Sequence, residues 1–168
     1  GMHILIYLMR SRHVSVHREA ARAVSNLLTS EASHSLFLAE DGLRSLFSVA
    51  ASRDQECLYN AALCFRKLTP NFANHDTIIA KGGLQPLIGL VGLTGLDLDL
   101  LAQCAGLLGN LAEDPHNQLA LVRDGAFAPL VRLSRVPHAG IQMDVARALC
   151  SISAHPDNQV GVFGPEEL

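Results

Sequence analysis

The chain has 168 residues, of which 49% are hydrophobic and 17% are charged, and its formal net charge is −3. This composition is too apolar for a disordered segment and suits one folded domain. No long basic run occurs in the sequence, which argues against nucleic acid as a partner, because a sequence-independent nucleic-acid binder carries a concentrated positive patch.

Two predicted helices open the chain, a short apolar one over residues 3–10 and a longer one over residues 14–29. The longer helix contains the string AARAVSNLL. Related strings, AALCFRKLT, CAGLLGNLA and VARALCSIS, follow it at intervals of 41, 43 and 41 residues. A fixed period in this range indicates a stack of repeated supersecondary units.

A second marker recurs with nearly the same period. Gly42, Gly83 and Gly125 lie at intervals of 41 and 42 residues, in AEDGLRSLFSV, AKGGLQPLIGL and VRDGAFAPLVRL. The residue that closes a helix often takes a positive φ angle, which costs glycine almost nothing. We therefore expect each glycine to form a turn between a short first helix and a second helix.

Residues 75–114 show the unit most clearly. The segment 75–77, His-Asp-Thr, offers side chains that would cap a short first helix, and the Gly82–Gly83 pair would end that helix. A second helix, a loop and a third, amphipathic helix are expected over residues 84–91, 92–95 and 97–112. Aspartates and glycines interrupt this apolar stretch, so we expect no membrane span.

Three helices per unit, a glycine turn and a third helix with an Asn-Leu ending resemble the armadillo repeat family. The best matches are IIAKGGLQPLIGLV and LVRDGAFAPLVRLS for the first two helices, and AARAVSNLL and CAGLLGNLA for the third. HEAT repeats are the nearest alternative, but they usually have two helices and no glycine turn. The resemblance implies an all-α fold, a right-handed α–α superhelix of the armadillo solenoid type.

We expect a single armadillo-repeat domain over residues 1–168. It would consist of a partial repeat, three full repeats and a second partial repeat, over residues 3–30, 34–73, 75–114, 116–155 and 156–168. Terminal repeats need polar caps, whereas the segment HILIYLM at the start is apolar. The sequence therefore predicts a fragment of a longer array, or an N-terminal face that packs against another copy.

In armadillo proteins the third helices line a concave groove, where an asparagine typically clamps the main chain of an extended peptide. An asparagine amide suits this role because it offers both a donor and an acceptor. The resemblance makes Asn26 and Asn110 candidate clamps, whereas Lys67 and Ser151 depart from the pattern. The full set of expected groove residues is Glu19, Arg22, Asn26, Asn60, Leu63, Lys67, Gln103, Gly106, Asn110, Asp144, Arg147 and Ser151.

The expected groove also predicts the charge of the partner. Arg22 and Arg147 stand where the importin-α branch usually carries a tryptophan, and this chain has no tryptophan. Both arginines would repel a lysine, so a nuclear-localisation signal is not the expected ligand. Glu19 and Asp144 lie three residues before the arginines and could pair with them. The expected partner is a protein, bound as an extended peptide or helix of acidic or mixed charge.

Catalytic and metal-binding patterns are absent from the sequence. There is no G-x-S-x-G, no H-E-x-x-H and no phosphate-binding glycine loop. His13 and His17 share a helix face, but no third ligand lies near them and arginines flank the pair. We therefore expect no enzyme activity, no cofactor and no metal.

The remaining histidines and the cysteines have structural interpretations. Histidines at positions 34, 75, 116 and 155 recur near the unit junctions, where they are expected to cap or end helices. The four cysteines, Cys57, Cys64, Cys104 and Cys150, form no C-x-x-C pair. They are expected to be buried free thiols in a reducing compartment.

The sequence thus predicts a protein-interaction module in the cytoplasm, with the nucleus and the cilium left open. Two alternatives remain. The chain could be a regulatory or scaffolding arm of a larger multidomain enzyme, such as a ubiquitin ligase. It could also be a structural element that forms a homo-oligomer through its apolar N-terminal face.

Overall fold

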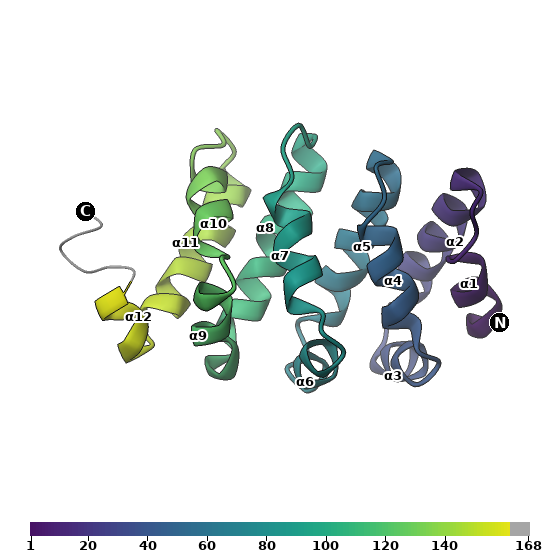
Figure 1. The fold of residues 1–168 in the computed structure, drawn as a ribbon, viewed down its shortest axis with the longest axis horizontal. Helices are drawn as coiled ribbons and strands as arrows, with labels where there is room; N and C mark the ends of the chain where they lie inside the picture. Colours follow the sequence, from purple (N-terminus) through teal and green to yellow (C-terminus); the bar gives the residue numbers. More distant parts are fainter. Residues whose placement is uncertain (162–168) are drawn as a thin grey trace. The chain divides into compact units, whose positions relative to one another are not determined.

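The computed structural model describes residues 1–161 and contains, within that range, twelve helices and no strand (Figure 1). The helices are α1 (Met2–Leu8), α2 (Val14–Leu27), α3 (Glu31–Ala39), α4 (Gly42–Ala50), α5 (Gln55–Leu68), α6 (Ala73–Ala80), α7 (Leu84–Gly92), α8 (Leu98–Glu113), α9 (Pro115–Arg123), α10 (Phe127–Ser134), α11 (Ala139–Ser153) and α12 (Pro156–Gly161). The predicted all-α fold is confirmed. Part of the expected last partial repeat, residues 162–168, lies outside the described residues.

The helices pack into two compact units, Gly1–Leu90 (unit 1) and Val91–Leu168 (unit 2), and the division falls within α7. In unit 1, α1 packs on α2, and α2 packs on α5. In unit 2, α8 and α10 both pack on α11. Figure 1 shows α3 and α6 nearly end-on, so that these first helices run across the neighbouring ones. The expected repeat bounds within a single domain stay a prediction.

Several of the long third helices begin at a side chain that caps the first turn. The carboxylate of Asp54 accepts a hydrogen bond of 2.9 Å from the Cys57 N–H, and that of Asp97 accepts one of 2.8 Å from the Leu100 N–H. Such acceptors satisfy backbone donors that have no partner within the helix. The predicted start of a third helix at Asp97 is therefore confirmed.

The cap expected for α6 is wrong. This helix begins at Ala73, before the predicted segment 75–77, and its Ala73 N–H donates a 3.0 Å hydrogen bond to the side-chain oxygen of Asn71. Asn74 instead turns back and donates a 2.7 Å hydrogen bond to the carbonyl oxygen of Leu68, in the last turn of α5. His75 is buried, with its Nε2 2.7 Å from the carbonyl oxygen of Thr69. Asn74 and His75 therefore cap the end of the preceding helix.

The same amide contact recurs at the junctions of α8 with α9 and of α11 with α12. The side chain of Asn117 donates to the Leu111 carbonyl at 3.1 Å, and that of Asn158 donates to the Ile152 carbonyl at 3.0 Å. Both asparagines are buried. Since carbonyls in the last turn of a helix lack intrahelical partners, these amides satisfy groups that burial would otherwise leave unpaired.

The predicted turn between first and second helices is present. The prediction that Gly42, Gly83 and Gly125 occupy equivalent positions in it is wrong. Positive φ angles occur at Asp41 (57°), Gly82 (75°) and Gly125 (96°). Gly42 and Gly83 each follow such a residue, so they are equivalent to each other and not to Gly125. The αL position tolerates aspartate, since its short polar side chain makes this conformation less costly than for most residues.

Glycine is required at positions 42 and 83 because a side chain would overlap neighbouring atoms, and not because φ is positive. A Cβ atom on Gly42 would lie 2.4 Å from the ring of Phe37, and one on Gly83 would lie 2.7 Å from the carbonyl oxygen of Ile78. These glycines therefore let the second helix start in contact with the end of the first.

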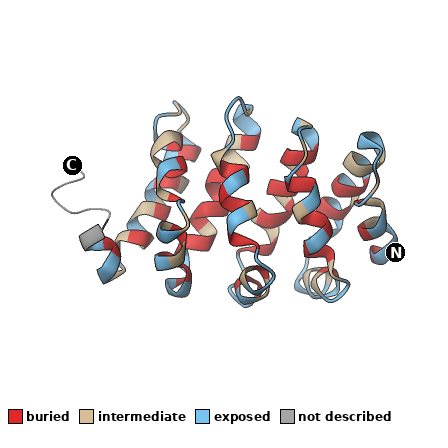
Figure 2. Ribbon diagram, in the orientation of Figure 1, coloured by how far each residue is buried: buried red, intermediate tan, exposed pale blue. Residues whose placement is uncertain are grey.

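Burial follows the amphipathic pattern, with exposed residues gathered at helix ends and loops (Figure 2). Cys57, Cys64 and Cys104 are buried free thiols, and burial raises the pKa of Cys64 and of Cys104 to about 12. The expectation of burial is wrong for Cys150, which is exposed on α11. Within residues 1–161, no helix is both long enough and apolar enough to cross a membrane.

The junction histidines differ from one another. His34 lies inside α3, so the prediction that it caps or ends a helix is wrong. His75 lies inside α6 but contacts the Thr69 carbonyl at the end of α5, as predicted for a cap. His155 accepts a hydrogen bond at its Nδ1 from the Asp157 N–H in the first turn of α12, as predicted for a cap. The sequence analysis missed His138, which caps α11 by accepting a hydrogen bond of 3.2 Å from the Ile141 N–H.

Candidate partner-binding surface

In unit 1, α2 carries three of the predicted groove residues. Arg22 donates a hydrogen bond to the carboxylate of Glu19, three residues earlier on the same helix. The predicted pairing is therefore confirmed, and it leaves the two side chains with no net charge between them. Asn26 is exposed in the last turn of α2.

Helix α5 packs against α2, and Lys67 of α5 makes one of the contacts between the two helices. Its ammonium group donates a hydrogen bond to the backbone carbonyl of Ser25, the residue before Asn26. This places Lys67 beside the exposed Asn26. Leu63 is half-buried, whereas Asn60 is buried and its amide donates to the Glu56 carbonyl at 2.8 Å within α5.

In unit 2, Arg147 of α11 joins the predicted residues of two helices. Its guanidinium donates to Asp144 at 3.0 Å on its own helix and to the Asn110 side-chain oxygen at 3.4 Å on α8. It also donates to the carboxylate of Glu113, on the last turn of α8. Gly109 gives the guanidinium room, because a Cβ at that residue would lie 2.6 Å from an Arg147 terminal nitrogen.

The other predicted residues of unit 2 lie on the same two helices. Gln103 is half-buried on α8, and Gly106 is buried. Ser151 is half-buried, one turn after Arg147 on α11. The structure thus joins the candidate clamp Asn110 to Asp144 and Arg147 within unit 2.

Comparisons with known proteins address what these units are. The family model of the armadillo/beta-catenin-like repeat matches residues 114–154. A computationally designed armadillo repeat protein for modular peptide recognition superimposes with a TM-score of 0.87 at 20% identity, covering 99% of this chain and 70% of that chain. The chain has the armadillo-repeat fold. A designed armadillo repeat protein solved in complex with the peptide (KR)4 has a TM-score of 0.80 at 18% identity, covering 90% of this chain and 64% of that chain.

A natural relative is Vacuolar protein 8 of Candida albicans (strain SC5314 / ATCC MYA-2876). It is 28% identical over 123 residues, which are 73% of this chain and 21% of that protein. The chain therefore spans about a fifth of the length of this curated relative. The likeness to the designed armadillo proteins establishes the fold, and the armadillo resemblance predicted from the sequence is confirmed.

The sequence analysis missed two participants in this candidate surface. Glu113 completes the network around Arg147, and it stands one helical turn after Asn110, so extending the groove column by three residues would have found it. The Ser25 carbonyl, which receives Lys67, carries no sequence signal because every residue has a carbonyl. Among residues 1–161, no three side chains lie together in a way that could hold a metal ion.

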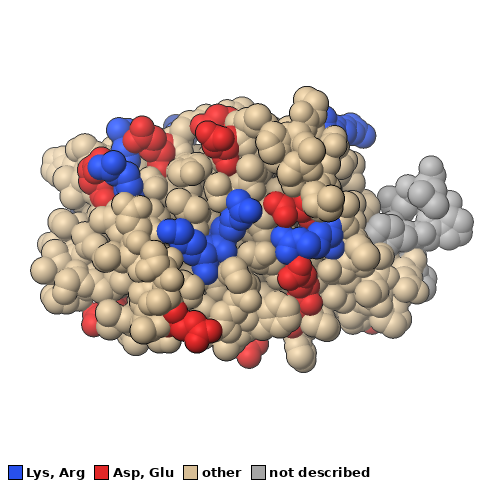
Figure 3. Space-filling model, turned by 180° about the vertical axis from the view of Figure 1, so that it is seen from behind, with Lys and Arg blue, Asp and Glu red and all other residues tan. Residues whose placement is uncertain are grey.

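A second ion-pair network links the starts of α2 and α5 in unit 1. Arg18 donates to both carboxylate oxygens of Asp54, and its Nε lies 3.0 Å from a carboxylate oxygen of Glu56. The hydrogen bond from Arg18, together with that from the Cys57 N–H, lowers the pKa of Asp54 to about 2. Figure 3 shows one face of the molecule, on which acidic side chains lie beside several of the basic ones.

The Asp54 pKa predicts acid sensitivity. Because this pKa is about 2 in the fold and 3.8 ordinarily, the stabilisation from its ionised form is present above pH 3.8 and is lost as the pH falls from 3.8 to 2. Asp54→Asn keeps a capping oxygen but cannot ionise. We expect urea unfolding to give a loss of about 1–2 kcal/mol for this variant at pH 7, shrinking towards zero near pH 2. A loss that stays constant with pH would contradict the assignment.

The Lys67 contact predicts a stabilising role for this residue. An ammonium group at the last turn of α2 satisfies a carbonyl and favours the negative end of the helix dipole. We expect Lys67→Glu to lower the free energy of unfolding by about 1–2 kcal/mol, because it removes the donor and adds a negative charge there. Lys81→Glu is the matched control, since the exposed Lys81 pairs at 3.3 Å with the carboxylate of the half-buried Asp41 and not with a backbone carbonyl. Equal losses in the two variants would contradict the role of the Ser25 contact.

Proposed function

We propose that this chain is a non-enzymatic protein-interaction module that holds an extended peptide or a helix of a partner protein against its third helices. The observation that carries the proposal is the placement of polar side chains where consecutive third helices meet. In unit 1, Asn26 lies beside Lys67 at the contact of α2 with α5. In unit 2, Asn110 and Arg147 meet at the contact of α8 with α11.

The chemistry of these side chains suits a peptide main chain. Amide and ammonium groups present donors, and an asparagine adds an acceptor, so such a surface can bond both groups of a peptide unit. Armadillo-repeat proteins commonly bind peptides or other proteins, and the designed armadillo protein solved with (KR)4 supports this use of the fold.

We propose a partner of mixed charge. In unit 1, the side chains of Glu19, Arg22 and Lys67 sum to a formal charge of +1. In unit 2, Glu113 and Asp144 both bond Arg147, so this network has a formal charge of −1. Arg147 would therefore not repel a basic side chain as an isolated arginine would. The cytoplasmic location expected from the sequence stays a prediction.

The test compares capture of partner proteins by the immobilised chain and by two variants. Asn26→Ala with Asn110→Ala removes both candidate clamps at exposed or half-exposed positions, so the fold is expected to survive. Gln85→Ala is the matched control, because Gln85 is an exposed amide on the second helix α7. We expect at least a fivefold loss of the captured proteins with the double variant and no loss with the control, measured by quantitative mass spectrometry. Unchanged capture by the double variant would rule out the third-helix surface as the binding site.

A further inference from the structure

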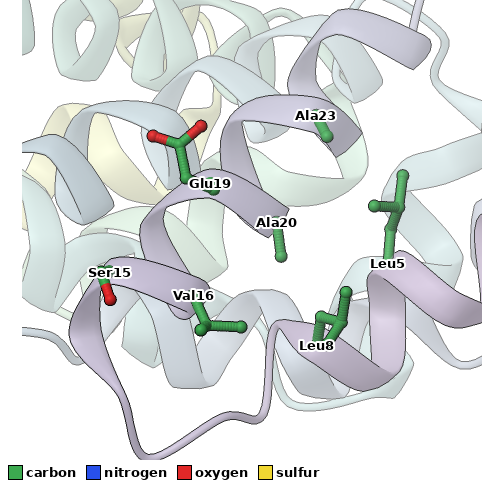
Figure 4. A pocket seen from close by; sticks show the side chains of 7 residues that line it. All are labelled: Leu5, Leu8, Ser15, Val16, Glu19, Ala20 and Ala23. Atoms are coloured by element: carbon green, nitrogen blue, oxygen red, sulfur yellow. The ribbon is translucent and has the colours of Figure 1, made fainter.

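The segment between α1 and α2 presents an exposed serine preceded by two arginines. Residues 10–15 read RSRHVS, so arginines stand three and five residues before Ser15. Ser15 is exposed in the first turn of α2, and its hydroxyl makes no hydrogen bond within residues 1–161. Figure 4 shows it at the start of α2, at the rim of a pocket and apart from Leu5 and Leu8 of α1. The hydroxyl is therefore accessible to a modifying enzyme.

The position of an arginine three residues before a hydroxyl occurs at three places in the sequence. The other two hydroxyls belong to Ser25 and Thr69, and neither has an arginine five residues earlier. Ser25 is 1% exposed and Thr69 is 0% exposed. Their hydroxyls donate to carbonyl oxygens of the preceding helical turn, at 2.8 and 2.9 Å. Of the three hydroxyls, only that of Ser15 can be reached in the folded chain.

The internal repeat places acidic residues at the position of Ser15. The counterparts of Ser15, at intervals of 41 and 43 residues, are Glu56 and Asp99, each the second residue of a third helix. Both are exposed, and the side chain of Glu56 is 69% exposed although α2 packs on α5. This position therefore stays accessible when a preceding repeat lies alongside. The first turn of α2 itself contains no acidic residue.

Ser15 also lies on the helix face that carries the candidate partner-binding residues of unit 1. Glu19, Arg22 and Asn26 follow it by four, seven and eleven residues, a spacing that keeps side chains on one face of a helix. The formal charge of Glu19, Arg22 and Lys67 together is +1. A phosphate on Ser15 would carry a charge of about −2 at pH 7, so the sum for this face would become about −1.

We propose that Ser15 is a phosphorylation site for a serine kinase that selects arginine three and five residues before its acceptor. Such selection by charge pattern decides which hydroxyl of a protein enters the kinase. In the reaction, the Ser15 Oγ forms a bond to the γ-phosphorus of ATP, and the bond from that phosphorus to the β–γ bridging oxygen breaks. ADP leaves, and a base of the kinase accepts the hydroxyl proton.

The phosphate has two consequences for unit 1. It gives α2 an acidic first turn like those of α5 and α8, where negative charge is favoured by the helix dipole. It also weakens the attraction of the α2 face for acidic segments of a partner. This second consequence rests on the proposed function, whereas the modification of Ser15 does not.

The test incubates the full chain with a purified arginine-selective serine kinase and MgATP. Mass spectrometry of the intact chain and of its peptides counts and locates the phosphate. We expect one phosphate per chain, on Ser15, with none on the buried Ser25 or Thr69. The Ser15→Ala variant is expected to stay unmodified. A chain without phosphate, or with its phosphate on other residues, would overturn the proposal.

Two arginine variants test whether the spacing is recognised. Arg12→Ala removes the arginine three residues before Ser15 and is expected to slow phosphorylation about tenfold. Arg53→Ala is the matched control, because Arg53 is the exposed counterpart of Arg12 with Glu56 three residues later. It is expected to leave the rate unchanged. Equal rates in the two variants would contradict recognition through the arginines and overturn the assignment.

The effect on charge is measured with a fluorescent peptide of alternating glutamate and serine residues as the probe. We expect its Kd, from fluorescence anisotropy, to rise about threefold when the chain is phosphorylated. The kinase-treated Ser15→Ala chain is expected to keep the Kd of the untreated chain. An equal Kd before and after phosphorylation would overturn the regulatory role of Ser15. None of these measurements uses the partner proteins captured by the immobilised chain, so failure of this proposal is distinguishable from failure of the proposed function.

Discussion

Replacing Gly83 with alanine is expected to lower the free energy of unfolding by about 2–3 kcal/mol, as measured by urea denaturation. The new Cβ would lie 2.7 Å from the Ile78 carbonyl oxygen and 2.8 Å from the ring of Phe47. The carbonyl cannot move away cheaply, because it accepts a 2.9 Å hydrogen bond from the Gly83 N–H that closes α6. The expected loss of stability therefore comes either from the steric overlap or from breaking the hydrogen bond that closes the turn.

Gly89→Ala is the matched control for this change. Gly89 is an exposed residue in α7, and a Cβ there would meet no atom within 4 Å. Alanine in a helix interior is favoured over glycine by about 0.5–1 kcal/mol, so this variant is expected to be more stable than the parent. If the Gly83→Ala protein were as stable as the Gly89→Ala protein, the steric overlap expected at residue 83 would be contradicted.

Replacing Arg132 with alanine is expected to lower the free energy of unfolding by about 2–3 kcal/mol. Arg132 reaches from α10 to the end of α7, where its guanidinium donates to the carbonyls of Val91, Gly92 and Leu93 at 2.6, 2.9 and 3.1 Å. Charged hydrogen bonds of this kind are among the stronger ones, and here one side chain satisfies three carbonyls at a helix end.

Two further variants separate the bonds of Arg132 from its charge. Arg132→Lys keeps the charge but loses the planar fork that spans several acceptors, so we expect it to recover less than half of the loss. Arg135→Ala removes an exposed arginine three residues later and is expected to change the stability by less than about 0.5 kcal/mol. Full recovery by lysine would mean that charge, and not the geometry of the three carbonyls, carries the effect.

The helices themselves were predictable because their determinants are local. The apolar spacing of the third helices and the capping Asp97 act within a turn or two of the residue concerned. The period of about 41 residues repeats these local signals along the chain. The positive-φ column was not predictable from the glycines alone. Asp41 takes the αL conformation directly before a glycine whose own role is to leave room for Phe37, so two different requirements produced one apparent pattern.

The contacts of the candidate surface were predictable only where both residues lie on the same helix. The pairs Glu19–Arg22 and Asp144–Arg147 follow from a spacing of three residues within one helix, and both form. The bond from Lys67 to the Ser25 carbonyl and the bond from Arg147 to Asn110 join separate helices. Such bonds depend on how neighbouring helices are rotated and shifted against each other, which a pattern along one chain does not contain.

The packing of α2 on α5 and of α8 on α11 also bears on how fast each unit forms. In both cases the two helices lie about one repeat apart in the sequence, so little chain entropy is lost in bringing them together. Proteins dominated by contacts of short sequence separation fold within microseconds to milliseconds. Stopped-flow refolding should therefore find the main fluorescence or circular-dichroism change near or within the dead time of the instrument.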